Sequence, residues 1–240
     1  MPASPNAFLT ARWQQLAMLN FDVDPALLHP WLPAGVELDT WNGRTFVSLV
    51  GFWFLDTRLW GVPIPGHRNF PEVNLRFYVR RQAAEGWRRG VVFVKELVPR
   101  PAIAWTARLL YGENYVALPM HAATDPATVR YSWRWRGHEN YLQLTAGGDA
   151  TLPTPDSLPA FIVEHYWGYA RRRNGSTVEY RVAHPSWLVQ PVAAWEIVCD
   201  AATLYGPVFA DVLRTPSSAL LAVGSSVTVY HGQRLALELP

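Results

Sequence analysis

Polar side chains recur at every second residue of the segment Phe70–Arg80, which reads FPEVNLRFYVR. Because successive side chains of a β-strand point to opposite faces, these polar groups share one face and apolar residues fill the other. The polar set consists of a carboxylate, an amide, a guanidinium and a phenol: Glu72, Asn74, Arg76 and Tyr78. The pattern fits an exposed strand, and it also fits a hydrogen-bonding wall inside a ligand cavity.

A single side-chain amine is present, because the 21 basic residues include one lysine, Lys95. It lies in the segment Gly90–Val98, whose two faces are both mainly apolar, so we expect this strand to be covered on both sides. Burial lowers the pKa of a lysine, which is the condition for an amine that forms a Schiff base. The alternative is a lysine in the place of an arginine, paired with a carboxylate or extended to the rim of the sheet.

Pairing between these two segments decides which charged group joins the polar face. If Asn74 opposes Lys95, the amine shares the face of Glu72; if Asn74 opposes Glu96, two carboxylates share it. We expect the second register. A lysine can reach a partner beyond an apolar layer, whereas the shorter Glu96 would be left there as an unpaired buried charge, which costs several kcal/mol.

The seven histidines have no metal-binding spacing, since no two of them are two or four residues apart. We therefore expect no metal site. We also expect no cofactor, because the sequence contains neither a phosphate-binding glycine loop nor a Gly-x-Ser-x-Gly nucleophile motif. The net charge of +2 gives no general attraction for nucleic acid.

Turn signals divide the chain into hairpins and short helices. Hairpins are predicted over residues 36–56, 70–98 and 165–184, and further strands over residues 15–22, 131–136, 141–145 and 226–230. Short helices are predicted over residues 24–32, over residues 102–110 and from Asp156 onward. This arrangement is typical of an α+β protein with a closed or strongly curved antiparallel β-barrel. We assign residues 1–10 to an N-terminal tail and residues 11–240 to a single domain.

The single cysteine, Cys199, excludes an internal disulfide, and the first residues lack the features of a signal peptide. The most apolar stretch, Phe46–Leu55, spans ten residues and is too short for a membrane helix. We therefore expect a cytoplasmic protein with no membrane association. The sequence leaves the oligomeric state open.

Four segments resemble a known bacterial family. They read RWQQLAMLNFDVDPALLHPWLP, FPEVNLRFYV, GVVFVKELVPR and YGENYVALPM. The resemblance, to the YqjF-like family (domain of unknown function family 2071), covers roughly residues 11–235. That family is grouped with the acetoacetate decarboxylase-like fold, a closed antiparallel barrel with a central cavity and flanking helices. The resemblance implies this fold and transfers no function.

Decarboxylases of that fold carry a glutamate in one strand and a reactive lysine in a later segment. Glu72 resembles the glutamate position, and YGENYVALPM resembles the lysine segment. Where the resemblance implies a lysine, after Pro119, this chain has Met120 and His121. Neither side chain forms a Schiff base, so we predict no acetoacetate decarboxylase activity.

The function that we expect first is binding of a small apolar or carboxylated molecule in a barrel cavity. The alternative is an enzyme, a lyase or hydrolase acting on a small keto or carboxylic acid, with Glu72 and either Lys95 or His121 as acid and base. A structural or partner-binding module is the third alternative. The residues expected to contact the ligand are Glu72, Asn74, Arg76, Tyr78, Glu96, Tyr115, Met120 and His121.

Overall fold

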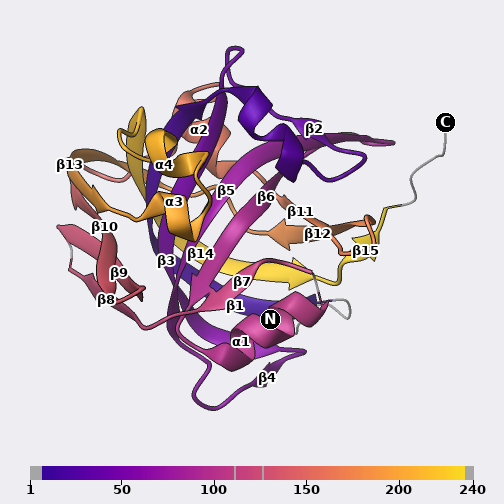
Figure 1. The fold of residues 1–240 in the computed structure, drawn as a ribbon, viewed down its shortest axis with the longest axis horizontal. Helices are drawn as coiled ribbons and strands as arrows, with labels where there is room; N and C mark the ends of the chain where they lie inside the picture. The colour runs from indigo at the N-terminus through magenta and orange to yellow at the C-terminus, as the bar shows by residue number, and fades with distance from the viewer. Residues whose placement is uncertain (1–6, 111, 126, 236–240) are drawn as a thin grey trace.

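Strands dominate the computed structural model, which describes residues 7–110, 112–125 and 127–235 (Figure 1). Within these residues, fifteen strands belong to one hydrogen-bonded sheet. They are β1 (Ala7–Val23), β2 (Glu37–Leu38), β3 (Thr45–Leu59), β4 (Val62–Pro63), β5 (Phe70–Ala83), β6 (Gly86–Val98), β7 (Tyr115–Ala117), β8 (Met120–Thr124), β9 (Thr128–Trp135), β10 (His138–Ala146), β11 (Trp167–Arg171), β12 (Thr177–Ala183), β13 (Val189–Val198), β14 (Ser218–Tyr230) and β15 (Gln233–Arg234). The predicted predominance of antiparallel strands is confirmed.

The helices are short. They are α1 (Pro101–Leu110), α2 (Leu158–Val163), α3 (Ala201–Leu204) and α4 (Phe209–Val212), together with the 3-10 turns η1 (Pro25–Leu27) and η2 (His29–Trp31). In the described part of the chain, no helix has the length and apolar character that a membrane crossing requires.

The order of strand pairing returns to its starting point. It leads from β12 through β11, β6, β5, β3 and β1 to β14, and β14 pairs with β12. The last link is short, with Val182 opposite Val229 and Ala183 opposite Thr228. A second group of strands, β13, β10, β9 and β8, continues from β14 and lies at the left in Figure 1.

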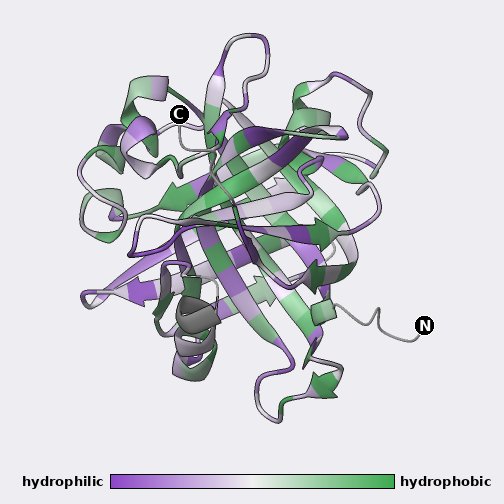
Figure 2. Cartoon of the chain, turned by 90° about the vertical axis from the view of Figure 1, so that its right-hand side faces the viewer, coloured by the Kyte–Doolittle hydropathy of each residue, from purple (hydrophilic) through white to green (hydrophobic). Residues whose placement is uncertain are grey.

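Strand β5 is buried on both of its faces. Val73, Leu75 and Phe77 point into a core shared with β9, β10, α3 and α4. On the other face, Glu72 and Asn74 are each only 2% exposed. The interpretation of this segment as a solvent-exposed strand is therefore wrong. Hydrophobic and hydrophilic residues alternate along the strands in Figure 2, and here the hydrophilic set faces the interior of the protein.

The structure differs from the sequence prediction at several element boundaries. β1 begins at Ala7, so residues 7–10 belong to the sheet and not to a tail. The predicted helix after Asp24 is two 3-10 turns, because Pro30 lacks the N–H that a continuous helix would need. Asp24 does cap the first turn, accepting a 2.8 Å hydrogen bond from the backbone N–H of Ala26. The strand predicted over residues 226–230 is the end of β14, which begins at Ser218.

Candidate functional site

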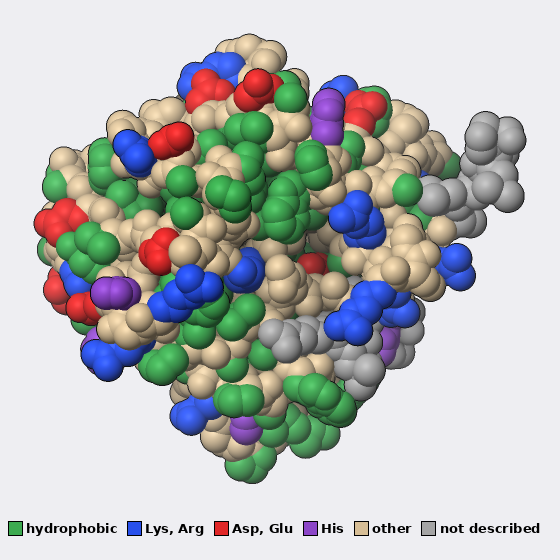
Figure 3. Space-filling model, in the orientation of Figure 1, with side chains coloured by type: hydrophobic (Ala, Val, Ile, Leu, Met, Phe, Trp, Pro, Cys, Tyr) green, Lys and Arg blue, Asp and Glu red, His purple; other side chains and the backbone are tan. Residues whose placement is uncertain are grey.

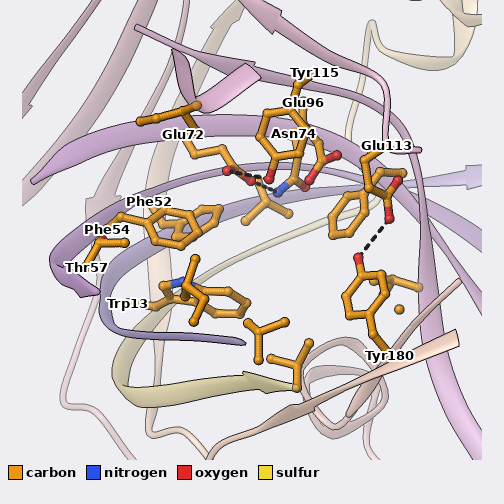
Figure 4. A pocket seen from close by; sticks show the side chains of 18 of the residues that line it. Trp13, Phe52, Phe54, Thr57, Glu72, Asn74, Glu96, Glu113, Tyr115 and Tyr180 are labelled. Atoms are coloured by element: carbon orange, nitrogen blue, oxygen red, sulfur yellow. Dashed lines mark hydrogen bonds between the residues drawn. The ribbon is translucent and has the colours of Figure 1, made fainter. Parts of the chain in front are cut away.

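A cavity of about 220 Å³ opens between β1, β3, β5, β6, β11, β12 and α1. The space-filling view shows a hollow near the centre of this face, with an acidic side chain inside it (Figure 3). Most of the lining is apolar. Trp13 contacts Phe52 and Phe54 edge to face, with ring centres 5.2 and 5.5 Å apart, and these aromatic side chains form one wall. The carboxyl groups gather at another side (Figure 4).

Three buried glutamates form a carboxyl cluster in this cavity, and we use that name for Glu72, Glu96 and Glu113. Glu72 lies on β5 and Glu96 on β6, and the predicted pairing of Asn74 with Glu96 is confirmed. β7 runs parallel to β6 and places Tyr115 opposite Glu96. Since side chains two residues apart share a face of an extended chain, Glu113 joins Tyr115 at the cavity.

Hydrogen bonds satisfy most of the carboxyl cluster. Glu72 accepts from Asn74 Nδ2 at 3.0 Å and from the Tyr115 hydroxyl at 3.1 Å. The Tyr180 hydroxyl donates to Glu113 at 2.8 Å. Oε2 of Glu96 is buried and has no hydrogen-bond partner in the described structure. The cluster therefore offers one unsatisfied oxygen to the cavity.

Burial makes ionisation of the carboxyl cluster unfavourable. It raises the pKa of Glu72 to about 7 and that of Glu113 to about 8. The pKa of Glu96 is raised well above its ordinary value by burial and then by the charges of Glu113 and Glu72. The cluster therefore retains protons at pH values at which exposed glutamates are fully ionised.

Arg76 contributes a cation to the same cavity. Its side chain reaches past the Tyr78 ring, with Cζ 5.6 Å from the ring centre, and Nη2 donates to the carbonyl of Ile162 at 3.4 Å. Nε is buried and has no hydrogen-bond partner in the regions that the structure describes. Among the described residues, no carboxylate oxygen lies within 4.0 Å of this guanidinium. Within the described part of the chain, Arg76 is therefore a buried cation without a contacting ion-pair partner, although its charge counteracts the rise that burial causes in the pKa of Glu72.

Tyr78 lies beneath the cavity wall. Its hydroxyl is 2.6 Å from Oγ of Ser48, and its ring packs against Arg76 and His165. It supports two lining residues and is absent from the lining itself.

His165 also lines the cavity and was not a candidate from the sequence. It follows α2 and lies 3.2 Å from the carboxylate of Asp39, which accepts a 2.7 Å bond from Arg89. The sequence could not predict the contact between Asp39 and His165, because the two residues are 126 positions apart. Glu113 was missed as well, although its place two residues before Tyr115 could have identified it.

Lys95 lies on the opposite face of the sheet from the carboxyl cluster. It pairs with Leu75, and its Nζ donates to the carbonyl of Leu204 at the end of α3. The amine is 6.0 Å from the ring centres of both Trp135 and Tyr205, and burial lowers its pKa. Lys95 thus holds a helix end against the sheet and does not line the cavity.

Met120 and His121 also lie away from the cavity. The chain leaves β6 after Leu118, whose N–H donates to Val98, and then pairs with β9. Met120 packs against the core on that side, and His121 is exposed opposite Ser132. Within the described part of the segment YGENYVALPM, residues 112–120, the residues that line the cavity are Glu113 and Tyr115. In the described residues, no group of three or more histidine, cysteine, aspartate or glutamate side chains could hold a metal ion.

Comparison with known proteins gives one family and one fold. Residues 10–226 match domain of unknown function family 2071, described as an uncharacterized conserved protein. The uncharacterized protein YqjF of Bacillus subtilis (strain 168) is 28% identical over 189 residues, which are 76% of this chain and 75% of that protein.

Two solved structures share the fold at low sequence identity. The acetoacetate decarboxylase of Legionella pneumophila superimposes with a TM-score of 0.67 at 13% identity, over 98% of this chain and 92% of that one. The enduracididine biosynthesis enzyme MppR, complexed with pyruvate, gives a TM-score of 0.65 at 12% identity, over 98% and 92% of the two chains. These likenesses establish the acetoacetate decarboxylase-like fold, and the family match establishes that the chain belongs to domain of unknown function family 2071.

Proposed function

We propose that this protein binds a small carboxylic acid with an apolar body, and that Arg76 holds the carboxylate. The observation that carries the proposal is the state of Arg76, which is 9% exposed and, among the residues that the structure describes, has no carboxylate within 4.0 Å and no partner for its buried Nε. A buried charge without a counter-ion is costly, so an anion that enters the cavity relieves that cost. The planar guanidinium can also donate two parallel hydrogen bonds to the two oxygens of a carboxylate.

The remaining walls suit the apolar part of such a ligand. Trp13, Phe52 and Phe54 present aromatic surface, and burial of apolar surface contributes about 25 cal/mol per Å². We infer that the returning path of strands forms a barrel whose interior is this cavity. The MppR structure contains a carboxylic acid, pyruvate, which supports the same ligand class for this fold. The cytoplasm remains the location that we expect.

The first test of this function compares two probes that differ in charge. Octanoate and octanol are titrated calorimetrically into the wild type, into Arg76→Gln and into Arg214→Gln, whose guanidinium is 76% exposed. Charged hydrogen bonds contribute about 1.5–3 kcal/mol, so Arg76→Gln should weaken octanoate binding by at least about tenfold and leave octanol binding unchanged. The control Arg214→Gln should match the wild type. Equal affinity of octanoate and octanol for the wild type would contradict the proposal.

Acid–base catalysis is a second candidate function, favoured by the carboxyl cluster. A pKa of about 7 for Glu72 and about 8 for Glu113 suits groups that exchange protons near neutral pH. Neither Lys95 nor His121 lines the cavity, so the partner of Glu72 in such a reaction would be another lining group, and Glu113 of the carboxyl cluster is the one that we propose. We still predict no decarboxylation of acetoacetate, and carbon dioxide release that Lys95→Ala abolishes would contradict this.

A further inference from the structure

The imidazole of His165 presents a second polar group to the cavity, outside the carboxyl cluster. His165 is 7% exposed and lines the cavity. Its Nε2 lies 3.2 Å from Oδ2 of Asp39, and Nε of Arg89 donates to the same oxygen at 2.7 Å. Nδ1, the other ring nitrogen, is buried and has no hydrogen-bond partner among the described residues.

The contact with Asp39 fixes the tautomer of this imidazole. Burial opposes the charge of Asp39, but hydrogen bonds from His165 and Arg89 outweigh it and lower the pKa of Asp39. An ionised carboxylate can only accept, so the proton of the neutral imidazole must lie on Nε2. Nδ1 then carries a lone pair. Burial lowers the pKa of His165 to about 4, which keeps this nitrogen an acceptor throughout the physiological pH range.

Arg76 and His165 both line the cavity near the ring of Tyr78, and the charge of Arg76 adds to burial in lowering the pKa of His165. Both pack against the ring of Tyr78, with Cζ of Arg76 at 5.6 Å and the imidazole centre at 4.7 Å from its centre. Nη2 of Arg76 donates to the carbonyl of Ile162, three residues before His165. A ligand whose carboxylate reaches Arg76 therefore has the imidazole as a neighbouring polar contact.

We propose that Nδ1 of His165 accepts a hydrogen bond from a hydroxyl group of the ligand, so that the pocket takes a hydroxy carboxylic acid. This inference rests on the proposed function, because Arg76 must hold the carboxylate for the hydroxyl to meet His165. A ligand without a donor leaves a buried acceptor unsatisfied, which is the usual physical source of discrimination between a hydroxylated molecule and its analogue. A lone pair held in a fixed direction also repels an ether oxygen.

The experiment uses three acids and a matched pair of substitutions. The probes are octanoate, 2-hydroxyoctanoate and 2-methoxyoctanoate. His165→Gln keeps an N–H near the position of Nε2, so it can still bond to Asp39, but it removes the acceptor Nδ1. His165→Asn keeps a polar atom near the position of Nδ1 and loses the contact with Asp39. His138→Gln, at an exposed position, is the control.

In the wild type and in His138→Gln, 2-hydroxyoctanoate should bind about tenfold more tightly than octanoate, and 2-methoxyoctanoate should bind less tightly than either. His165→Gln should abolish this preference, so that 2-hydroxyoctanoate binds this variant no more tightly than octanoate does. If octanoate binds and the hydroxy acid has no advantage, the His165 inference is overturned and the proposed function stands. If no acid binds, the proposed function itself fails.

A spectroscopic measurement keeps the inference testable if the variants at His165 do not fold. In wild-type protein labelled with ¹⁵N in its histidines, the His165 ring should show the neutral Nε2–H tautomer. Addition of 2-hydroxyoctanoate should move the Nδ1 resonance in the direction expected of a hydrogen-bonded acceptor, and octanoate should not. A proton on Nδ1 in the free protein would overturn the inference.

Discussion

Replacing Glu113 by glutamine should make the stability of the protein less sensitive to pH. The pKa of Glu113 is about 8 in the folded protein, against an ordinary value of 4.5. Between these two values the unfolded chain releases this proton and the folded protein retains it, so stability falls as pH rises. Each pH unit in that window costs about 1.4 kcal/mol. By pH 8 the wild type should therefore have lost about 5 kcal/mol through this one group.

The glutamine variant cannot ionise, and its side-chain oxygen can still accept from Tyr180. It should come closest to the wild type below pH 4.5, the ordinary pKa, where Glu113 is mainly protonated in both states, and exceed it increasingly at higher pH. Removing this charge also eases ionisation of Glu96, whose pKa Glu113 helps to raise, and this acts in the same direction. The difference should be largest at pH 8.

Urea unfolding from pH 5 to pH 8 measures this difference. The wild type, Glu113→Gln and Glu139→Gln are compared, because the side chain of Glu139 is 61% exposed and serves as the control. The reasoning would be refuted if the free energies of unfolding of the wild type and Glu113→Gln differed by the same amount at every pH. That result would mean that Glu113 is ionised in the folded protein at neutral pH.

Two further substitutions test the packing around the cavity and the face of Lys95. Gly168→Ala should lower the melting temperature and disturb the near-UV circular dichroism, because the added Cβ would lie 2.1 Å from Cζ of Tyr180 and push that ring away from Glu113. An unchanged melting temperature would mean that the Tyr180 ring does not pack on Gly168. Lys95→Met should leave octanoate affinity unchanged and cost about 1 kcal/mol of stability through the lost hydrogen bond to Leu204. A large loss of affinity would place Lys95 at the ligand after all.

The β5–β6 hairpin shows what the sequence can predict. Strict alternation in β5 predicted one polar face, and the contrast in length between Lys95 and Glu96 predicted that Asn74 faces Glu96, as observed. Both inferences use only local geometry and the cost of an unpaired charge. The burial of the polar face could not be predicted, because exposed and cavity-lining strands share one pattern.

The remaining cavity residues depend on long-range topology. His165 and Asp39 meet because α2 returns the chain to the sheet, and no spacing rule connects residues so far apart. Met120 and His121 were assigned through a resemblance in linear order, whereas the chain turns away from β6 at Pro119, whose carbonyl accepts from Arg134 of β9. A resemblance in order carries no information on such a turn.

A single irregularity in β6 decides the chemical character of the cavity. Leu75 faces Lys95 and the next residue, Arg76, faces Phe93, so Val94 is an extra residue in the ladder. Val91 and Phe93 line the cavity, and an unbroken alternation would bring the side chain at position 95 into it. Because of the bulge, Glu96 lines it instead. The insertion or loss of one residue in this strand would thus place an amine in the cavity instead of an acid, with no change in any other side chain. Relatives of this chain should therefore be compared by which face of this strand each residue occupies before their site residues are equated.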